Sequence, residues 1–248
     1  MEREKLGSRL GFILLSAGCA IGIGNVWKFP YMVGQYGGAI FVLIYLIFLV
    51  IMGVPVMTME FSMGRASRKS PVKLYDKLAP QGSKWHIHGY LAMAGNYILM
   101  MFYTTVCGWM VQYFVEMARG SFEGKDATGV ANVFGEMLAD PVSLIIYMVI
   151  VVILGFAINS MGLQNGLEKV TKVMMLALMV IMIVLAFNSL FMDGGKAGLE
   201  FYLKPDLNKM QEIGMGKVIV GAMNQAFFTL SLGIGSMAIF GSYIGNEI

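Results

Sequence analysis

Polar residues and glycines interrupt one of the most apolar segments of this sequence, SAGCAIGIGNVWKFPY, at residues 16–31. They are three glycines, an amide, a lysine and a proline: Gly18, Gly22, Gly24, Asn25, Lys28 and Pro30. Glycine lowers the cost of leaving the helical conformation, and proline removes a backbone donor. In lipid, an unwound backbone is tolerated only where it lines a cavity or is buried in protein. We therefore expect a broken helix, whose free carbonyls could coordinate a bare cation and whose free amides could hold an anionic group.

A second apolar segment, NQAFFTLSLGIGSMAIFGSYIG at residues 224–245, has the same character. Its middle contains two hydroxyl residues and two glycines, namely Thr229, Ser231, Gly233 and Gly235. Packing is the simpler explanation for both segments, because a Gly-x-x-x-Gly spacing lets helices approach closely and hydroxyls can bond back to the preceding turn. Two interrupted helices, at the first and sixth positions, instead match transporters built from inverted repeats. We favour the transporter interpretation.

The composition indicates an integral membrane protein. Of the 248 residues, 57% are hydrophobic and 13% are charged, and the mean hydropathy is +0.70, which leaves too little polar surface for a soluble globule. The apolar runs are close to the ~20 residues that a membrane helix needs, whereas a barrel would show short alternating strands. We predict a single transmembrane domain, residues 1–248, with six helical spans at about 9–35, 39–64, 89–117, 141–158, 170–190 and 217–245.

The basic residues predict the orientation of the spans. Arg3, Lys5 and Arg9 precede the first span, and the loop after the second span contains Arg65, Arg68, Lys69, Lys73, Lys77 and Lys84. Positive loops face the cytoplasm, so we expect a multi-pass protein with a cytoplasmic N-terminus. Both cysteines, Cys19 and Cys107, fall in apolar spans, and there is no glycosylation sequon, as expected for a prokaryotic inner membrane. The formal net charge of +3 requires no nucleic-acid partner.

The two interrupted segments resemble the first- and sixth-helix signatures of the neurotransmitter:sodium symporter family. The resemblance extends through GVPVMTMEFSMGR in the second span, FYTTVCGW in the third and GLEFYLKPDL before the sixth. It implies an all-α integral membrane protein of the LeuT-type inverted-repeat fold, comprising the first repeat plus the sixth helix, with helices 1 and 6 broken. It also implies sodium-coupled symport of an amino acid by alternating access in a full-length parent.

The resemblance further implies two sodium sites. The carbonyls of Gly18 and Ile21 would face one sodium ion. The Ala20 carbonyl, the Asn25 amide oxygen, and the hydroxyl and carbonyl of Thr229 would face the other, and ligation by oxygen alone suits a hard cation. The carboxylate of the substrate would complete the second site and accept hydrogen bonds from the Gly22 amide and the Tyr103 hydroxyl. Sodium and substrate would then each strengthen the binding of the other.

The substrate implied by the resemblance is an amino acid. Relatives that carry monoamines have an aspartate near the position of Gly22, whereas a glycine leaves room for a carboxylate. Besides Ala20 and Thr229, the side-chain pocket would be formed by Leu99, Phe228, Ser231 and Ile234. Its apolar walls would favour a hydrophobic or aromatic cargo. For each apolar residue taken alone, ordinary packing is the alternative.

By the same resemblance, the gates would consist of Arg3, Lys28, Tyr103, Phe228 and Tyr243. Lys28 replaces an arginine that is common in the outer gate and cannot form the same bidentate pair with a carboxylate, so the gate would be weaker. Alternatively, Lys28 extends outward to the membrane interface. Leu6 stands where many members have a tryptophan, close to the cytoplasmic-gate residue Arg3.

Three further features of the sequence involve single residues or small groups of residues. Tyr45, Gln225 and Thr229 match positions around the chloride site of the family, but the deciding residue would lie in a seventh helix, so chloride dependence stays open. Glu60 resembles a family acid near the unwound segments; structural support is favoured over a proton relay, because no titratable partner is evident. The pair His86 and His88 falls short of a usual set of metal ligands.

Members of the family are about twice as long as this chain, so the expected partners are a second repeat (helices 7 onward), an amino acid substrate and the lipid bilayer. The residues above would form half a site, and the chain is not expected to transport alone. It could be a fragment, which we favour, a partner in a split transporter, or a shortened protein that does not transport. A six-helix channel is the alternative from another class, although no filter-like loop is evident. An enzyme is disfavoured because no catalytic constellation is present.

Overall fold

The computed structural model describes residues 9–244, and within this range every regular element is a helix. Four stretches of continuous helix are long and apolar enough to cross a membrane. The first combines α3 (Ala39–Phe48), the π-helical turn η2 (Leu49–Gly53) and α4 (Val54–Ser67). The others are α6 (His86–Ala118), α8 (Pro141–Ser160), and η3 (Leu163–Glu168) continued by α9 (Lys169–Phe191).

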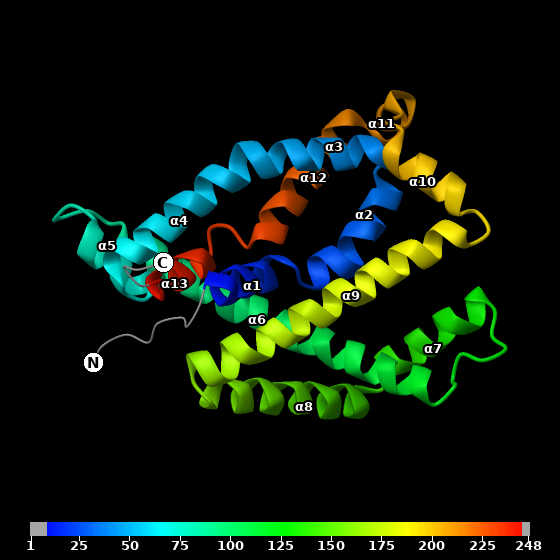
Figure 1. The fold of residues 1–248 in the computed structure, drawn as a ribbon, viewed down its shortest axis with the longest axis horizontal. Coiled ribbons are helices and arrows are strands. Elements are labelled where there is room, and N and C mark those ends of the chain that lie inside the picture. The colour runs from blue at the N-terminus through cyan, green and yellow to red at the C-terminus, as the bar shows by residue number, and fades with distance from the viewer. Residues whose placement is uncertain (1–8, 245–248) are drawn as a thin grey trace. The chain divides into compact units, whose positions relative to one another are not determined.

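The first and sixth apolar segments are each interrupted, as Figure 1 shows. The first segment comprises α1 (Arg9–Ala20), the π-helical η1 (Gly24–Lys28) and α2 (Phe29–Gln35). The sixth comprises α12 (Met215–Leu230) and α13 (Ser236–Ser242), with an irregular link between them. The prediction that helices 1 and 6 are broken is therefore confirmed.

Short helices connect the long ones: α5 (Pro71–Leu78), α7 (Ala127–Ala139), α10 (Gly195–Leu203) and α11 (Leu207–Ile213). Aspartate side chains cap three of the helices. Asp126 accepts from the Gly129 amide at α7, Asp140 from the Val142 amide at α8, and Asp206 from the Asn208 amide at α11. Such caps satisfy backbone donors that have no partner inside the helix.

The fifth span begins earlier than the sequence indicated. The sequence places this span at about 170–190, whereas the helix starts at Leu163. Glu168 is buried within η3, and its carboxylate lies 2.6 Å from the ammonium of Lys172. A buried charge is tolerated when an opposite charge pairs with it, so this polar stretch can be helical.

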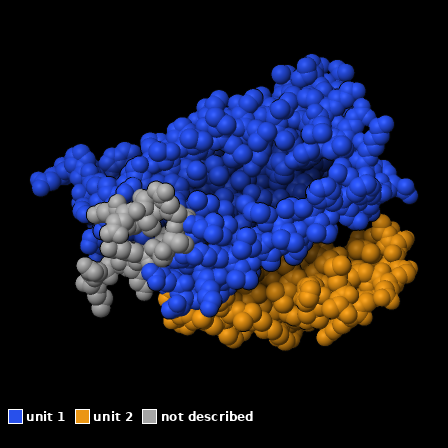
Figure 2. Space-filling view, in the orientation of Figure 1, with its two compact units in different colours: residues 1–92, 163–248 blue, residues 93–162 orange. Residues whose placement is uncertain are grey.

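The chain divides into two compact units, coloured separately in Figure 2. Unit 1 contains the described residues 9–92 and 163–244, and unit 2 contains residues 93–162. Aromatic side chains of α6 and α7 pack together in unit 2, where the Trp109 and Phe134 rings meet edge to face at 6.4 Å. The main core of unit 1 is formed by buried side chains of α2, α3, α11 and α12: Val33, Phe41, Tyr45, Met210, Val218, Ala222 and Ala226.

Small residues bring α13 close to α4 within unit 1. A Cβ added at Gly64 would collide with the backbone carbonyl of Ala238, and one added at Gly241 would collide with the backbone of Phe61. Glycine at both positions therefore permits a backbone-to-backbone approach that a larger residue would prevent.

Candidate functional site

The interruption of the first helix lies at Ile21 and Gly22, between α1 and η1. The Asn25 and Val26 amides both donate to the Gly22 carbonyl, at 2.9 and 3.2 Å. The Asn25 side chain reaches back across the interruption, and its amide nitrogen donates to the Ala20 carbonyl at 3.0 Å. Asn25 thereby closes the end of α1 with its NH₂ group, which leaves its amide oxygen to act as an acceptor.

The interruption of the sixth helix runs from Ser231 to Gly235, a segment that we call the α12–α13 link. Ser231, Gly233 and Gly235 have φ angles of 50°, 82° and 78°. This left-handed region is accessible to glycine and uncommon for serine. Because it differs from the α-helical conformation, the helix α12 ends where the link begins. The Gly233 amide donates to the Glu60 carboxylate of α4 at 2.7 Å, which provides a partner for a backbone donor freed by the break.

The two interruptions meet through side chains. The Thr229 hydroxyl, in the last turn of α12, donates to the Asn25 amide oxygen at 3.0 Å. The Tyr45 hydroxyl donates to the Thr229 oxygen at 3.2 Å. The Gln225 side chain donates to the Gly24 carbonyl at 3.0 Å. We call this group the broken-helix cluster: Ala20, Gly24, Asn25, Tyr45, Gln225 and Thr229.

The broken-helix cluster is a polar centre inside an apolar unit. Thr229, Gln225 and Tyr45 are only 6%, 1% and 8% exposed. Buried polar groups cost free energy unless they are hydrogen-bonded, and the bonds above satisfy most of them. The Gln225 side-chain oxygen is an exception, since it is buried without a hydrogen-bond partner among the described residues.

The atoms of the cluster suit a hard monovalent cation. The acceptors near the interruptions are neutral oxygens of a carbonyl, an amide and a hydroxyl, provided by Ala20, Asn25 and Thr229. Hard cations such as sodium prefer oxygen ligands of this kind. Among the side chains that the structure describes, no group of three or more His, Cys, Asp or Glu residues could hold a metal ion.

Space and a positive charge lie next to the cluster. A Cβ added at Gly22 would meet no atom within 4 Å, whereas one added at Gly24 would overlap the Phe228 ring. The Lys28 ammonium lies 4.3 Å from the centre of that ring. Such a cation–π contact connects two of the predicted gate residues across the two broken helices.

The other predicted site residues lie in several places. Gly18, on α1, packs against Thr171 and Met175 of α9, and Ile21 is 40% exposed. Ser231 and Ile234 are half-buried in the α12–α13 link. Tyr243 packs beside a small cluster formed by Leu15 and Leu163.

Leu99 and Tyr103 belong to α6 in unit 2, where the Tyr103 ring meets that of Phe102 at 5.9 Å. Arg3 lies outside the described residues.

The sequence did not identify two groups that lie at these polar positions. The Gly24 carbonyl accepts from Gln225, and His88 lines a small cavity together with Glu60. A backbone carbonyl leaves no signal in the residue type. The sequence also gives no hint that His88 lies near Glu60, because the two residues are far apart along the chain.

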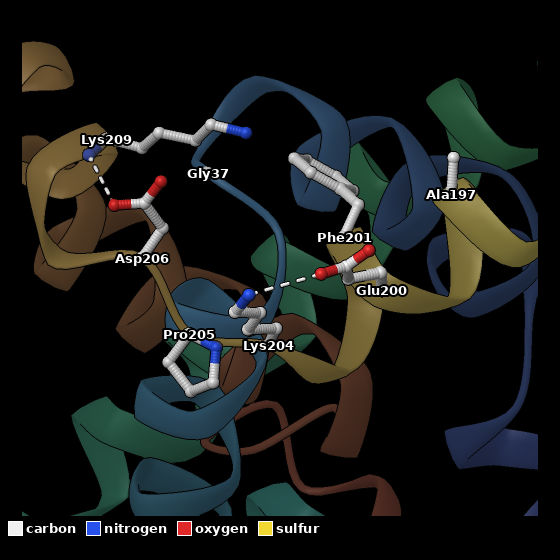
Figure 3. A pocket seen from close by; sticks show the side chains of 8 residues that line it. All are labelled: Gly37, Ala197, Glu200, Phe201, Lys204, Pro205, Asp206 and Lys209. Atoms are coloured by element: carbon white, nitrogen blue, oxygen red, sulfur yellow. Dashed lines mark hydrogen bonds and ion pairs between the residues drawn. The ribbon is translucent and has the colours of Figure 1, made fainter.

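A larger pocket of about 470 Å³ lies beside α10 and α11 and is lined by charged residues (Figure 3). Here the Glu200 carboxylate pairs with the Lys204 ammonium at 3.2 Å. The Lys209 ammonium lies 4.9 Å from the centre of the Phe201 ring. Both residues of the ion pair are well exposed, and exposed pairs of this kind contribute little stability. We assign no function to this pocket.

Comparison with known proteins places this geometry in a family. The sequence profile of the sodium:neurotransmitter symporter family matches residues 3–125 and 129–247. The uncharacterized sodium-dependent transporter YhdH of Bacillus subtilis is 34% identical over 96% of this chain and 51% of its own length. The sodium-dependent neutral amino acid transporter B(0)AT2 of Mus musculus is 25% identical over 98% of this chain and 36% of its own length. The chain thus spans about half, or less, of the length of these relatives.

A solved structure agrees with the sequence comparison. The crystal structure of MhsT in complex with L-phenylalanine superimposes with a TM-score of 0.89 and 36% sequence identity. The match covers 100% of this chain and 55% of MhsT. The all-helical fold therefore corresponds to about half of a LeuT-type transporter, and transporter membership sets the chain apart from enzymes. The profile, the relatives and the fold together show that this multi-pass membrane protein belongs to the sodium:neurotransmitter symporter family.

Proposed function

We propose that this chain provides the first half of a transporter that couples the inward movement of an amino acid to the sodium gradient. The observation that carries the proposal is the 3.0 Å hydrogen bond from the Thr229 hydroxyl to the Asn25 amide oxygen. It joins the interruptions of helices 1 and 6, so that polar atoms of both helices converge on one buried position. Broken helices that meet in this way are typical of transporter binding sites.

In this proposal, sodium binds at the broken-helix cluster. Asn25 and Thr229 provide side-chain oxygens, Ala20 and Thr229 provide carbonyls, and a second ion is held by the carbonyls of Gly18 and Ile21. The ion would compete with the hydrogen bond between Thr229 and Asn25 and bind their oxygens instead. Sodium supplies a positive charge, and the protein fixes the neutral dipoles that replace the hydration shell of the ion.

The proposed cargo is a hydrophobic or aromatic amino acid. The open space at Gly22 would admit its carboxylate, which could then also contact the sodium ion at Asn25 and Thr229. Phe228, Ser231 and Ile234 come from the end of α12 and the α12–α13 link, where a side-chain pocket would form. MhsT, which was solved with L-phenylalanine, makes this amino acid a suitable first substrate to test.

The remaining assignments are part of the same proposal. The gates consist of Arg3, Lys28, Tyr103, Phe228 and Tyr243, and the basic loop after the second span faces the cytoplasm of a prokaryotic cell. Tyr45, Gln225 and Thr229 are the residues on this chain that a chloride ion would contact. Helices 7 onward would complete both sodium sites and the pocket.

Uptake into membrane vesicles tests the proposal. One set of vesicles contains this chain alone, and a second set contains it together with the part of MhsT that it does not match. We expect sodium-dependent uptake of labelled phenylalanine only in the second set, because the chain alone has half of each site. Uptake by the chain alone would contradict the half-site assignment. Equal uptake with sodium or potassium in the second set would contradict sodium coupling.

A further inference from the structure

The first half of the broken first helix packs against another apolar helix within unit 1. One face of α1 meets η3 and the first turns of α9. Gly11, Leu15 and Gly18 share this face, because residues three or four positions apart lie on the same side of a helix. A Cβ added at Gly18 would lie 3.0 Å from the Thr171 side chain, and Leu15 is buried in a cluster with Leu163. The helix α1 is therefore in close contact with η3 and α9.

An acidic side chain lies at one end of this face. A Cβ added at Gly11 would overlap the carboxylate of Glu168. The Glu168 side chain is only 4% exposed, and its carboxylate lies 2.6 Å from the ammonium of Lys172, whose side chain is 31% exposed. Glycine at position 11 thus provides the space in which a buried charged group packs directly against the backbone of α1.

The ion pair fixes the position of the Glu168 carboxylate. Taking a carboxylate out of water is costly unless an opposite charge compensates it. The compensating Lys172 ammonium comes from four residues further along the same continuous helix, Leu163–Phe191. The carboxylate is therefore positioned by its own helix, and α1 can approach it only where a glycine makes room.

The other end of α1 carries groups of the candidate site. The Ala20 carbonyl, at the last residue of α1, accepts from the Asn25 side chain at 3.0 Å. Gly18 lies one turn or less before it, on the face that meets α9. Because α1 is a single helix from Arg9 to Ala20, a displacement at Gly11 would also move these carbonyls.

We propose that Glu168 is a positioning residue that latches α1 to α9 and thereby sets the place of the Gly18 and Ala20 carbonyls. The latch consists of the Glu168 carboxylate, the Lys172 ammonium that pairs with it, and the Gly11 backbone against which it packs. When the latch opens, α1 can leave α9 and take its carbonyls away from Asn25. The latch follows from these contacts alone, whereas its effect on sodium binding rests on the proposed function.

Hydrogen exchange of the full chain in detergent, measured by mass spectrometry without sodium, tests the latch. Gly11→Ala places a methyl group where the Glu168 carboxylate lies, so we expect the backbone amides of α1 to exchange about tenfold faster or more. Exchange in α3 and α4 should stay the same, because a local release differs from a general loss of stability. The matched control is Gly34→Ala in α2, where the added methyl group meets no atom within 4 Å and exchange in α1 should not change.

A second substitution shows whether the collision involves Glu168. Glu168→Ala removes the carboxylate and should itself accelerate exchange in α1. In this background Gly11→Ala should add little, because the methyl group then has room, whereas independent effects on the exchange rate would multiply. If Glu168→Ala does not fold, the comparison of Gly11→Ala with Gly34→Ala decides.

Three results would each overturn the latch. They are equal exchange of α1 in Gly11→Ala and Gly34→Ala, multiplied effects in the double variant, and equal acceleration in α1, α3 and α4.

The effect on the ion sites is measured separately, in the complete transporter. Glu168→Ala should lower the apparent sodium affinity about fivefold or more, although Glu168 is none of the proposed sodium ligands. Unchanged sodium affinity together with a loosened α1 would overturn the positioning role. An unsubstituted transporter without sodium dependence would instead contradict the proposed function and with it the effect on sodium, and the exchange measurements would still decide the latch.

Discussion

At the scale of single residues, the candidate site depends on neutral oxygens rather than on charged side chains. Asn25 serves both breaks, because its NH₂ group closes α1 at the Ala20 carbonyl while its oxygen accepts from Thr229. An aspartate in its place could not donate to Ala20, and an alanine could do neither. The two hydrogen bonds of Asn25 therefore need an amide at this position.

Gly22 provides the first residue-scale prediction. In the complete transporter, Gly22→Asp should weaken phenylalanine binding at least about tenfold, because its carboxylate would fill the open space and repel that of the substrate. Gly22→Ala is the matched control: a methyl group meets no atom within 4 Å, so binding should change much less. Competition binding with labelled phenylalanine measures both variants. Equal losses of phenylalanine affinity in the two variants would show that the loss is caused by steric bulk and not by charge.

Residue types predicted part of the site. Asn25 and Thr229 could be identified because polar residues are expensive in an apolar helix and need a partner. The Gly24 carbonyl could not, since every residue has one. The proximity of Glu60 and His88 could not be predicted either, because α4 and α6 are separated by the basic loop and only the folded chain brings both residues to the lining of one cavity.

At the scale of helices, the positions of the breaks were predictable and the lengths of some helices were not. Clustered glycines indicated both interruptions, and the left-handed φ angles at Gly233 and Gly235 explain the second. The early start of the fifth helix at Leu163 could not be inferred, because it depends on the burial of Glu168 next to Lys172. Local polarity was thus overridden by a tertiary contact.

The contact between α4 and α13 provides a prediction about stability. Gly64→Ala should lower the free energy of unfolding by about 1–3 kcal/mol, because the new methyl group would collide with the Ala238 backbone. Gly155→Ala, in the middle of α8 with no atom within 4 Å of the added group, should be neutral or slightly stabilising. Thermal unfolding in detergent compares them. A Gly64→Ala variant as stable as Gly155→Ala would contradict the close approach of the two helices.

The start of α8 should depend on pH. Hydrogen bonds from the Ser143 hydroxyl and amide and from the Val142 amide hold the pKa of Asp140 below its ordinary value of 3.8. Because the folded pKa is lowered, the cap is at full strength above about pH 4 and is lost as the pH falls through the folded value. Relative to the intrinsic exchange rate of each amide at the same pH, hydrogen exchange at Val142 and Ser143 should therefore accelerate as the pH falls through the folded pKa of Asp140.

The matched variant for this helix is Asp140→Asn. Asparagine caps a helix about as well as aspartate but does not titrate in this range. Exchange at the same two amides should then lose its additional acceleration below pH 4. Identical acid dependence in the variant and the unsubstituted chain would rule out Asp140 as the titrating cap.

At the scale of the whole molecule, the fold follows from two requirements that act together. Lipid requires helices whose backbone groups are satisfied, and the proposed ion binding would require backbone and side-chain groups that are free. The chain meets both by keeping four helical stretches continuous and by breaking two others where they face each other. The family match covers about half the length of the relatives, and under the proposed function further helices would close the site.

The most direct test of the central claim is the sodium dependence of phenylalanine binding in the complete transporter with Asn25→Ala. We predict that the apparent affinities for sodium and for phenylalanine both fall about tenfold or more. The Asn25 amide oxygen would bind the sodium ion that the phenylalanine carboxylate also contacts, so losing it would weaken the binding of both. Asn188→Ala, on the exposed end of α9, should leave both affinities unchanged. Unchanged sodium and phenylalanine affinities in a folded Asn25→Ala transporter would contradict the account.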